Sequence, residues 1–273
     1  MKKNKIKELT EYAKEIRKSI LEMIVVSNSS HIATAYSVVE ILTVLYFSVM
    51  RINPKKPDWL DRDRFILSKG HGAAANYAVL GHRGFFSKSL FKTYALDGGK
   101  LHGHSTYGVV PGIEFSTGSL GHGLPVAVGM AIAAKRTKKE YRVFVVLGDG
   151  DCQEGSNWEA IMAAGHYGLD NLVVIVDYNK LQGLGKVKDI MDLEPFADKW
   201  QAFKWEVREV DGHSVSDLLG ILKKIPFKKG KPSVILAHTV KGKGVSYMEH
   251  NIKWHYSTPL DENYSTAVKE LEK

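Results

Sequence analysis

Two short polar clusters stand at the ends of two apolar runs, and their side chains have the chemistry to hold a cation. Gly148-Asp149-Gly150 ends the run that starts at Val143, and Asp177-Tyr178-Asn179 ends the run that starts at Leu172. A carboxylate and an amide oxygen beside a diphosphate suit Mg²⁺, which takes six oxygen ligands at about 2.0–2.1 Å. Each cluster alone is also typical of an ordinary turn. Their pairing after two strand-like runs favours a metal site at Asp149 and Asn179.

The runs that carry these clusters are predicted to be strands of one parallel sheet. A right-handed crossover brings both carboxyl ends to the same edge, where ligands bind in open α/β sheets. A helix beginning near Ser156 could turn its backbone N–H groups toward an anion there. Apolar strands alternating with helical patterns predict an α/β fold whose mainly parallel sheet is covered on both faces. The expected strands are Arg64–Leu67, Arg142–Leu147, Leu172–Val176, Trp205–Val210 and Ser233–His238. The expected helices are 1–25, Ser37–Val49, His71–Leu80, Leu120–Lys135, Ser156–Tyr167, Glu194–Lys199 and Val215–Lys223.

Composition narrows the class of protein. The chain has 273 residues, 44% of them hydrophobic, and no linker rich in Pro, Ser or Gly, so one domain over residues 1–273 is expected. Its single cysteine, Cys152, excludes a disulfide framework and favours a reducing cytoplasm. No run reaches the roughly 20 apolar residues of a membrane span. The net charge of +8 indicates surface lysines or a field that attracts small phosphorylated ligands, and no nucleic-acid-binding motif accompanies it.

Several histidines and a glycine-rich loop are further candidates. His31, His71 and His104 each follow a small residue in or beside a loop, where a site at a strand end could use them. Imidazole transfers protons near neutral pH and hydrogen-bonds hydroxyl or phosphate groups. The loop Ser116–Leu124 opens a helix of small residues, and its glycines permit close approach of a ligand. Such a loop is a weak signal alone, because it also fits a tight turn.

Together these motifs resemble the transketolase family of thiamine-diphosphate enzymes. The family signature is GDG, about 30 residues and then Asn, and "GDGDCQEG" with "AGHYGLDNL" is close to the transketolase version. The resemblance extends through "SSH", "SKGHG", "GHS" and "STGSLGHGL" to "KGKGVSYMEHNIKWH", in the family's order over nearly the whole chain. It implies a three-layer α/β/α thiamine-diphosphate-binding fold and the cofactors thiamine diphosphate and Mg²⁺ (or Ca²⁺).

The resemblance also assigns roles to individual residues. It places His71 and His255 against the cofactor, and His31, His104 and His255 against the hydroxyls of a ketose donor. It gives the metal three ligands, Asp149, Asn179 and the carbonyl of Leu181. The remaining cofactor contacts that it implies are Gly118, Ser119, Leu120, Gly150 and Asn179. Glu154 suits the first turn of a helix in any protein, but in the family it joins carboxylates across a subunit interface.

Only the amino-terminal, diphosphate-binding half of a full-length transketolase is matched. The chain therefore resembles the amino-terminal subunit of a split transketolase, a transferase that moves a two-carbon unit from a ketose phosphate to an aldose phosphate in the cytoplasm, as in the pentose phosphate pathway. Its expected partner is a carboxy-terminal subunit carrying the pyrimidine-binding domain and its glutamate. Self-association to a heterotetramer is expected, without nucleic acid or membrane. Two residues depart from the family pattern, Ser105 and Tyr256, and the bulky Tyr256 puts the usual set of sugar phosphates in doubt.

Other functions remain as alternatives. A subunit similar to deoxyxylulose-phosphate synthase would depart from "SKGHG", and one similar to a 2-oxo acid dehydrogenase would lack this set of histidines. A non-catalytic thiamine-diphosphate-binding regulator would need the metal loop but not four histidines that face the substrate.

Overall fold

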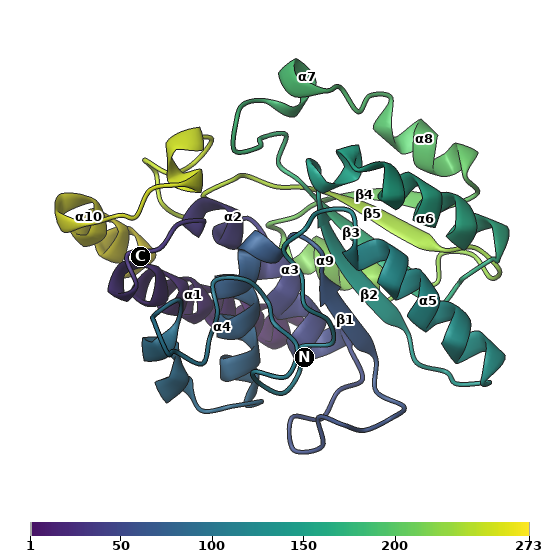
Figure 1. The fold of residues 1–273 in the computed structure, drawn as a ribbon, viewed down its shortest axis with the longest axis horizontal. Helices are drawn as coiled ribbons and strands as arrows, with labels where there is room; N and C mark the ends of the chain where they lie inside the picture. The colour runs from purple at the N-terminus through teal and green to yellow at the C-terminus, as the bar shows by residue number, and fades with distance from the viewer. Residues whose placement is uncertain (1, 273) are drawn as a thin grey trace.

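The computed structural model describes residues 2–272, so Met1 and Lys273 of the predicted domain lie outside the described residues. Within this range five strands form one sheet in the order β1-β2-β3-β5-β4, and every neighbouring pair is parallel (Figure 1). The strands are β1 (Arg64–Leu67), β2 (Val143–Gly148), β3 (Leu172–Tyr178), β4 (Glu206–Asp211) and β5 (Ser233–His238). The five predicted strands and the parallel sheet are therefore confirmed.

Helices cover both faces of this sheet and make three layers. On one face lie α5 (Gly123–Arg136), α6 (Gly155–His166) and α8 (Phe196–Ala202). On the other lie α1 (Lys2–Val26), α3 (Val39–Val44), α4 (Ala73–Arg83) and α9 (Val215–Leu222) (Figure 1). Successive residues of β2 face opposite layers: Val145 belongs to the apolar cluster that includes α5 and α6, and Phe144 and Val146 belong to the cluster that includes α1 and α3. Burial on both faces explains why the strands are apolar throughout.

The helix predicted over Ser37–Val49 corresponds to α3 and the π-helical turn that directly follows it, so it starts two residues later than predicted, and the short helix α2 before it was not predicted. α2 (Ile32–Tyr36) and α3 are separate, and a π-helical turn, η1 (Leu45–Val49), follows α3. At the division, the hydroxyl of Ser37 donates a hydrogen bond of 2.7 Å to Asp177 Oδ2 at the end of β3. Serine side chains that bond elsewhere weaken a continuous helix, so the contact with the sheet edge favours the break.

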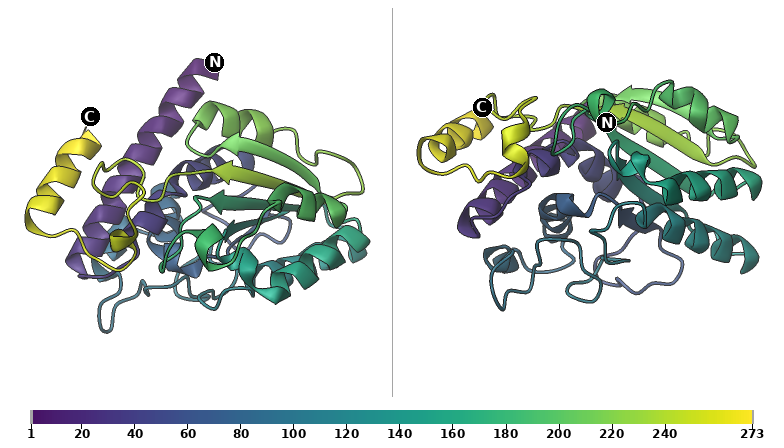
Figure 2. Two further views of the ribbon diagram at one scale, coloured as in Figure 1. Left: turned by 90° about the horizontal axis from the view of Figure 1, so that it is seen from above. Right: turned by 45° about the horizontal axis from the view of Figure 1, so that its top comes forward.

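Short helical turns lie in the loops around the carboxyl end of the sheet, and they are η2 (Gly70–Gly72), η4 (Asp151–Gln153), α7 (Val187–Ile190) and η5 (Ile252–His255). A further turn, η3 (Lys88–Thr93), packs against α1 and α4. The last helix, α10 (Asp261–Glu272), has no counterpart among the predicted helices. It lies beside α1 (Figure 2), where Lys14 Nζ donates a hydrogen bond of 2.6 Å to Glu272 O.

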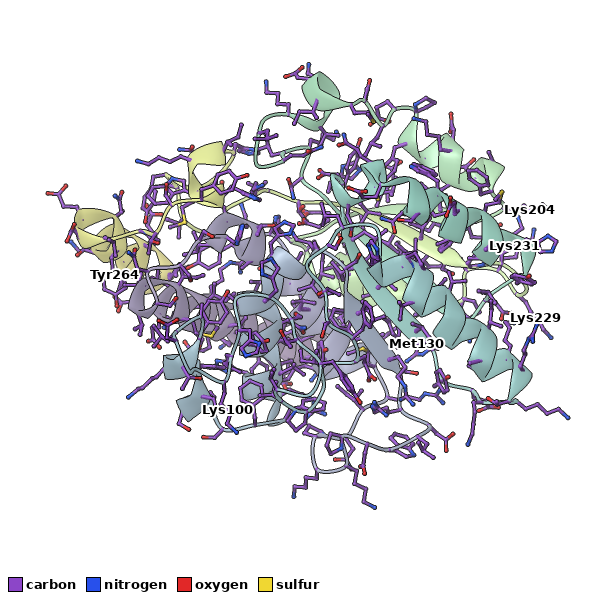
Figure 3. All side chains as sticks on the ribbon, in the orientation of Figure 1. Lys100, Met130, Lys204, Lys229, Lys231 and Tyr264 are labelled. Atoms are coloured by element: carbon purple, nitrogen blue, oxygen red, sulfur yellow. The ribbon has the colours of Figure 1, made fainter. Side chains whose placement is uncertain are left out.

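One edge strand of the sheet carries exposed, charged side chains. β4 is an edge strand, and Arg208, Glu209 and Asp211 on it are exposed. Lys204, Lys229 and Lys231 project near the amino-terminal ends of β4 and β5 (Figure 3), away from the edge that carries Asp149. Much of the net positive charge is thus dispersed surface charge. No helix within residues 2–272 combines the length and apolar character that crossing a membrane requires.

Candidate active site

The two polar clusters meet at the carboxyl edge of the sheet, as predicted. Gly148 of β2 pairs in register with Asp177 of β3, so the residues that follow each strand start side by side. Asp149 is buried, and its carboxylate accepts hydrogen bonds from Gly150 N at 2.8 Å and from Lys180 N at 2.5 Å. The second of these bonds joins the loop after β2 directly to the loop after β3.

A cavity of about 330 Å³ opens at this edge. Nine of the residues predicted from the sequence line it: His31, His71, Gly118, Leu120, Asp149, Gly150, Asn179, Leu181 and His255. Three do not line it, and these are His104, Ser119 and Glu154. A larger cavity of about 680 Å³ shares Asn179 and Leu181 with it but contains none of the four predicted histidines. We therefore take the smaller cavity as the candidate active site.

The four histidines gather although they come from four separate segments. The ring centroid of His31 lies 5.5 Å from that of His71, 6.1 Å from that of His104 and 5.0 Å from that of His255. The rings of His71 and His255 are 5.4 Å apart. The backbone joins the set as well, because His31 N donates a hydrogen bond of 3.0 Å to His255 O. His31 adopts the left-handed conformation, with φ of 75°, at the start of α2. The structure therefore brings the four histidines singled out in the sequence close together.

Burial keeps three of these rings neutral near pH 7. Burial, followed by the neighbouring His104 and Lys241, lowers the pKa of His31 to about 4. Burial and Lys241 lower the pKa of His255 to about 3, and the pKa of His71 is also well below its usual value because of burial and Lys69. A neutral imidazole offers one N–H and one lone pair. His255 Nδ1 is buried without a hydrogen-bond partner among residues 2–272, so it suits a polar group of a bound ligand.

Two buried lysines belong to the site, and the sequence analysis did not identify them. Lys69 and Lys241 are only 1% and 2% exposed, and both line the cavity. Lys69 forms a close ion pair with Asp177 and donates a hydrogen bond of 3.1 Å to Thr34 O. Lys241 has no carboxylate partner of this kind among the described residues, and its Nζ donates to Leu181 O at 3.2 Å. Burial and the charge of Lys69 lower the pKa of Lys241 to about 8. A cation so placed fits an anionic ligand such as a diphosphate.

The oxygen atoms near Asp149 fit a hard cation held partly by a ligand. Burial and the nearby Asp177 raise the pKa of Asp149 to about 7, and a bound cation would favour its ionised form. Asn179 Oδ1 accepts a hydrogen bond of 3.0 Å from Leu181 N and keeps a second lone pair. Among residues 2–272, no three His, Cys, Asp or Glu side chains are grouped to hold a metal. A cation here would therefore need the amide of Asn179, a backbone carbonyl and oxygens of its ligand.

The glycine-rich loop packs directly on the histidine segments. A Cβ atom added to Gly70 would lie 2.6 Å from Gly118 N, and one added to Gly118 would lie 3.3 Å from the His104 ring. These close approaches bring the backbone of Gly118 and Leu120 to the cavity wall, whereas Ser119 is exposed. Glu154 is also exposed, at the start of α6 and outside the cavity.

The two departures from the family pattern have different surroundings. Ser105 is buried, and its hydroxyl accepts a hydrogen bond of 3.2 Å from Asn76 Nδ2, so it supports the fold beneath His104. Tyr256 lines the cavity and is 60% exposed.

Comparison with known proteins shows which family this chain is similar to. Residues 9–271 match the family model described as "Transketolase, thiamine diphosphate binding domain". An apulose-4-phosphate transketolase subunit of Phocaeicola vulgatus is 46% identical over 93% of this chain and 90% of its own length. The 6-deoxy-6-sulfo-D-fructose transketolase subunit SqwG of Clostridium sp. is 41% identical over 97% of each chain.

Solved structures show the same fold. Transketolase from Leishmania mexicana superposes with a TM-score of 0.92 at 31% identity, and transketolase from Campylobacter jejuni with 0.91 at 32% identity. The match covers 97% and 98% of this chain but only 41% and 43% of those chains. The chain thus spans about two fifths of the length of these transketolases.

Proposed function

The chain belongs to the transketolase family of transferases, and on this premise we propose that it is the diphosphate-binding subunit of a two-polypeptide transketolase. It would transfer a two-carbon ketol unit from a ketose phosphate to an aldose phosphate. The observation that supports this most strongly is the set of four histidines beside the cavity of Asp149. A protein that only bound the cofactor would not need this set.

We assign the anion-binding part of the cavity to the diphosphate of thiamine diphosphate. When bound, this cofactor supplies the electron sink for cleaving the carbon–carbon bond next to a ketose carbonyl. Lys241 and the backbone at Gly150 and Gly118 would hold its diphosphate. Asp149, Asn179 and the carbonyl of Leu181 would hold Mg²⁺ or Ca²⁺ against it. The buried Nδ1 of His255, which no hydrogen-bonding group within residues 2–272 contacts, would hydrogen-bond the same ligand.

We assign the histidine side of the cavity to the sugar. His31 and His104 would orient the hydroxyls of the donor, and His71 and His255 would contact the cofactor, with His255 also facing the sugar. The lowered pKa values of His31 and His255 keep these rings neutral, so each can accept a hydrogen bond from a hydroxyl through one nitrogen and donate one to an oxygen through the other.

We further propose a partner subunit that carries the pyrimidine-binding domain and its glutamate. Two relatives of matching length are named as subunits, and the transketolases of known structure are more than twice as long as the matched region. The assembly would be a heterotetramer in which the exposed Glu154 contributes to the interface between active sites. The single cysteine, Cys152, is free and buried, which is consistent with the reducing conditions of the cytoplasm.

Reconstitution tests this function. The purified chain, its carboxy-terminal partner and the mixture of both are each supplied with thiamine diphosphate, Mg²⁺, xylulose 5-phosphate and ribose 5-phosphate. We expect two-carbon transfer only in the mixture. His31→Ala and His104→Ala should lower kcat/KM by about 10²-fold or more, since each removes a positioned polar group, while His166→Ala, an exposed histidine on α6, serves as the control.

Each outcome tests a different part of the proposal. Transfer by this chain alone would contradict the need for a partner. Absence of transfer in a mixture that binds the cofactor would contradict the reaction. Normal kcat/KM in both histidine variants would contradict their roles toward the substrate.

A further inference from the structure

An aromatic ring stands at the mouth of the active-site cavity. Tyr256 follows η5 and lines the cavity with its side chain, while more than half of its surface faces solvent. Its ring centroid lies 4.6 Å from that of His255 and 6.3 Å from that of His31. The ring therefore borders the part of the cavity that we assign to the sugar.

The loop after β3 meets Tyr256 across the same mouth. A Cβ atom added to Gly183 would lie 2.5 Å from the hydroxyl oxygen of Tyr256 and 3.0 Å from His255 Nε2. The backbone of Gly183 therefore touches both side chains. This loop is held closed at its base, since Gln182 N donates a hydrogen bond of 2.8 Å to Gly185 O and Leu181 bridges to Lys186. Leu184, which is 84% exposed, extends the wall outward.

The ring presents carbon rather than a hydrogen-bonding group to the sugar side. Its hydroxyl points to the Gly183 backbone and has no hydrogen-bond partner among residues 2–272. The neighbouring His255 is buried, so the wall cannot retreat behind Tyr256 without moving the histidine set. The cavity of about 330 Å³ is already at the small end of the range for ligand pockets, about 300–1,000 Å³.

We propose that Tyr256, backed by Gly183, is a specificity-determining residue that limits the length of the ketose donor. The site then favours five-carbon ketose phosphates over linear six-carbon ketose phosphates as donors. The extra carbon of a longer donor meets the Tyr256 ring. This inference rests on the proposed transfer of a two-carbon unit.

The test compares two donors in the reconstituted complex of this chain and its partner. For the wild type, Tyr256→Gly and Tyr256→Phe, kcat/KM is measured with xylulose 5-phosphate and with fructose 6-phosphate, using one acceptor at fixed concentration. The wild type should prefer the five-carbon donor. Tyr256→Gly should reduce that preference by about tenfold or more through a gain on the six-carbon donor, the size of effect that one carbon has in a tight pocket. Tyr256→Phe keeps the ring and should keep the preference.

The possible results are distinct. An unchanged preference in Tyr256→Gly, or an equal loss with both donors, would overturn the role in specificity. If Tyr256→Phe behaves like Tyr256→Gly, the preference depends on hydrogen bonding by the phenol hydroxyl and not on the bulk of the ring. That result would overturn the proposal as stated. A wild-type complex that binds the cofactor but transfers no two-carbon unit from either donor would instead contradict the proposed function.

Discussion

At the scale of single residues, Asp149 shows how the fold prepares an oxygen ligand. Its carboxylate is buried and accepts hydrogen bonds from two backbone N–H groups, but it forms no ion pair with a described lysine. Lys69 is taken by Asp177, and Lys241 contacts the carbonyl of Leu181. Burial and Asp177 consequently hold the pKa of Asp149 near 7, and a cation is the group that would complete this arrangement.

We therefore expect Asp149→Ala to abolish Mg²⁺-dependent binding of thiamine diphosphate in the reconstituted complex. The fold should persist, because the residue lies in a loop at the sheet edge and the ion pair of Lys69 with Asp177 remains. Isothermal titration of the complex with cofactor and Mg²⁺ measures the change. Asp192→Ala, an exposed carboxylate outside the cavity, is the matched control. Undiminished affinity in Asp149→Ala would remove this residue from the metal site.

From the sequence, site residues could be predicted where their chemistry stands out within a motif. Residues that matter because they are buried could not be predicted in this way. The positions of Asp149, Asn179, His31, His71 and His255 at one cavity, with His104 beside it, follow from strand ends and from the family pattern. Lys69 and Lys241 were missed because a lysine beside a glycine is ordinary in a surface loop. Only the folded chain shows that both ammonium groups are covered.

At the scale of secondary structure, apolar strands were predictable and helix boundaries were less so. β1 and β5 have the bounds expected from the sequence, because strands buried on both faces leave an uninterrupted apolar run. The short helix α2 was not predicted, and the break after it involves a partner of Ser37, Asp177, that lies 140 residues further along the chain. α10 was missed because only Ala267 and Leu271 on it are buried, too few to mark a helical period.

Three elements are tied together by one buried carboxylate, Glu40 of α3. Arg17 of α1 contacts it with two nitrogens, at 2.5 and 2.8 Å, and His213 Nδ1 lies 2.8 Å from its Oε2. Val240 N donates to His213 Nε2 at 2.8 Å, which leaves the proton of the neutral ring on Nδ1, facing Glu40. Burial opposes ionisation of Glu40, but Arg17 and His213 outweigh it and lower its pKa to about 2.

We expect Glu40→Ala to lower the free energy of unfolding by about 3–5 kcal/mol, because it leaves the guanidinium of Arg17 buried and unpaired. Urea unfolding measures the loss, and Glu8→Ala, from an exposed pair with Lys5 on α1, should cost about 1 kcal/mol or less. Since the pKa of Glu40 is depressed from 4.5, its contribution is complete above pH 4.5 and declines as the pH falls toward 2. An equal effect of both substitutions would show that the network carries little stability.

At the scale of the whole molecule, the site depends on parts from nearly the full length of the chain. His31 precedes all strands, Asp149 follows the second and His255 follows the last. Lys241, which has no carboxylate partner among residues 2–272, brings a positive charge to the cavity, whereas surface lysines such as Lys229 and Lys231 lie near the opposite ends of the strands (Figure 3). Attraction of a phosphorylated ligand is thus a property of the cavity as well as of the net charge of +8.

The charged outer strand β4 has a consequence for the behaviour of the protein in concentrated solution. An uncovered strand offers unpaired backbone groups to other molecules, and charged side chains discourage such edge-to-edge aggregation. Replacing Arg208 and Glu209 by valine leaves the net charge unchanged but makes this strand apolar and β-prone. At elevated concentration, we expect light scattering to grow faster for this β4 double variant than for the control double variant Lys5→Val/Glu8→Val on helix α1. Equal scattering would mean that colloidal stability has another source. The charged side chains of β4 thus keep the exposed edge of the sheet from pairing with the same edge of other molecules of the protein.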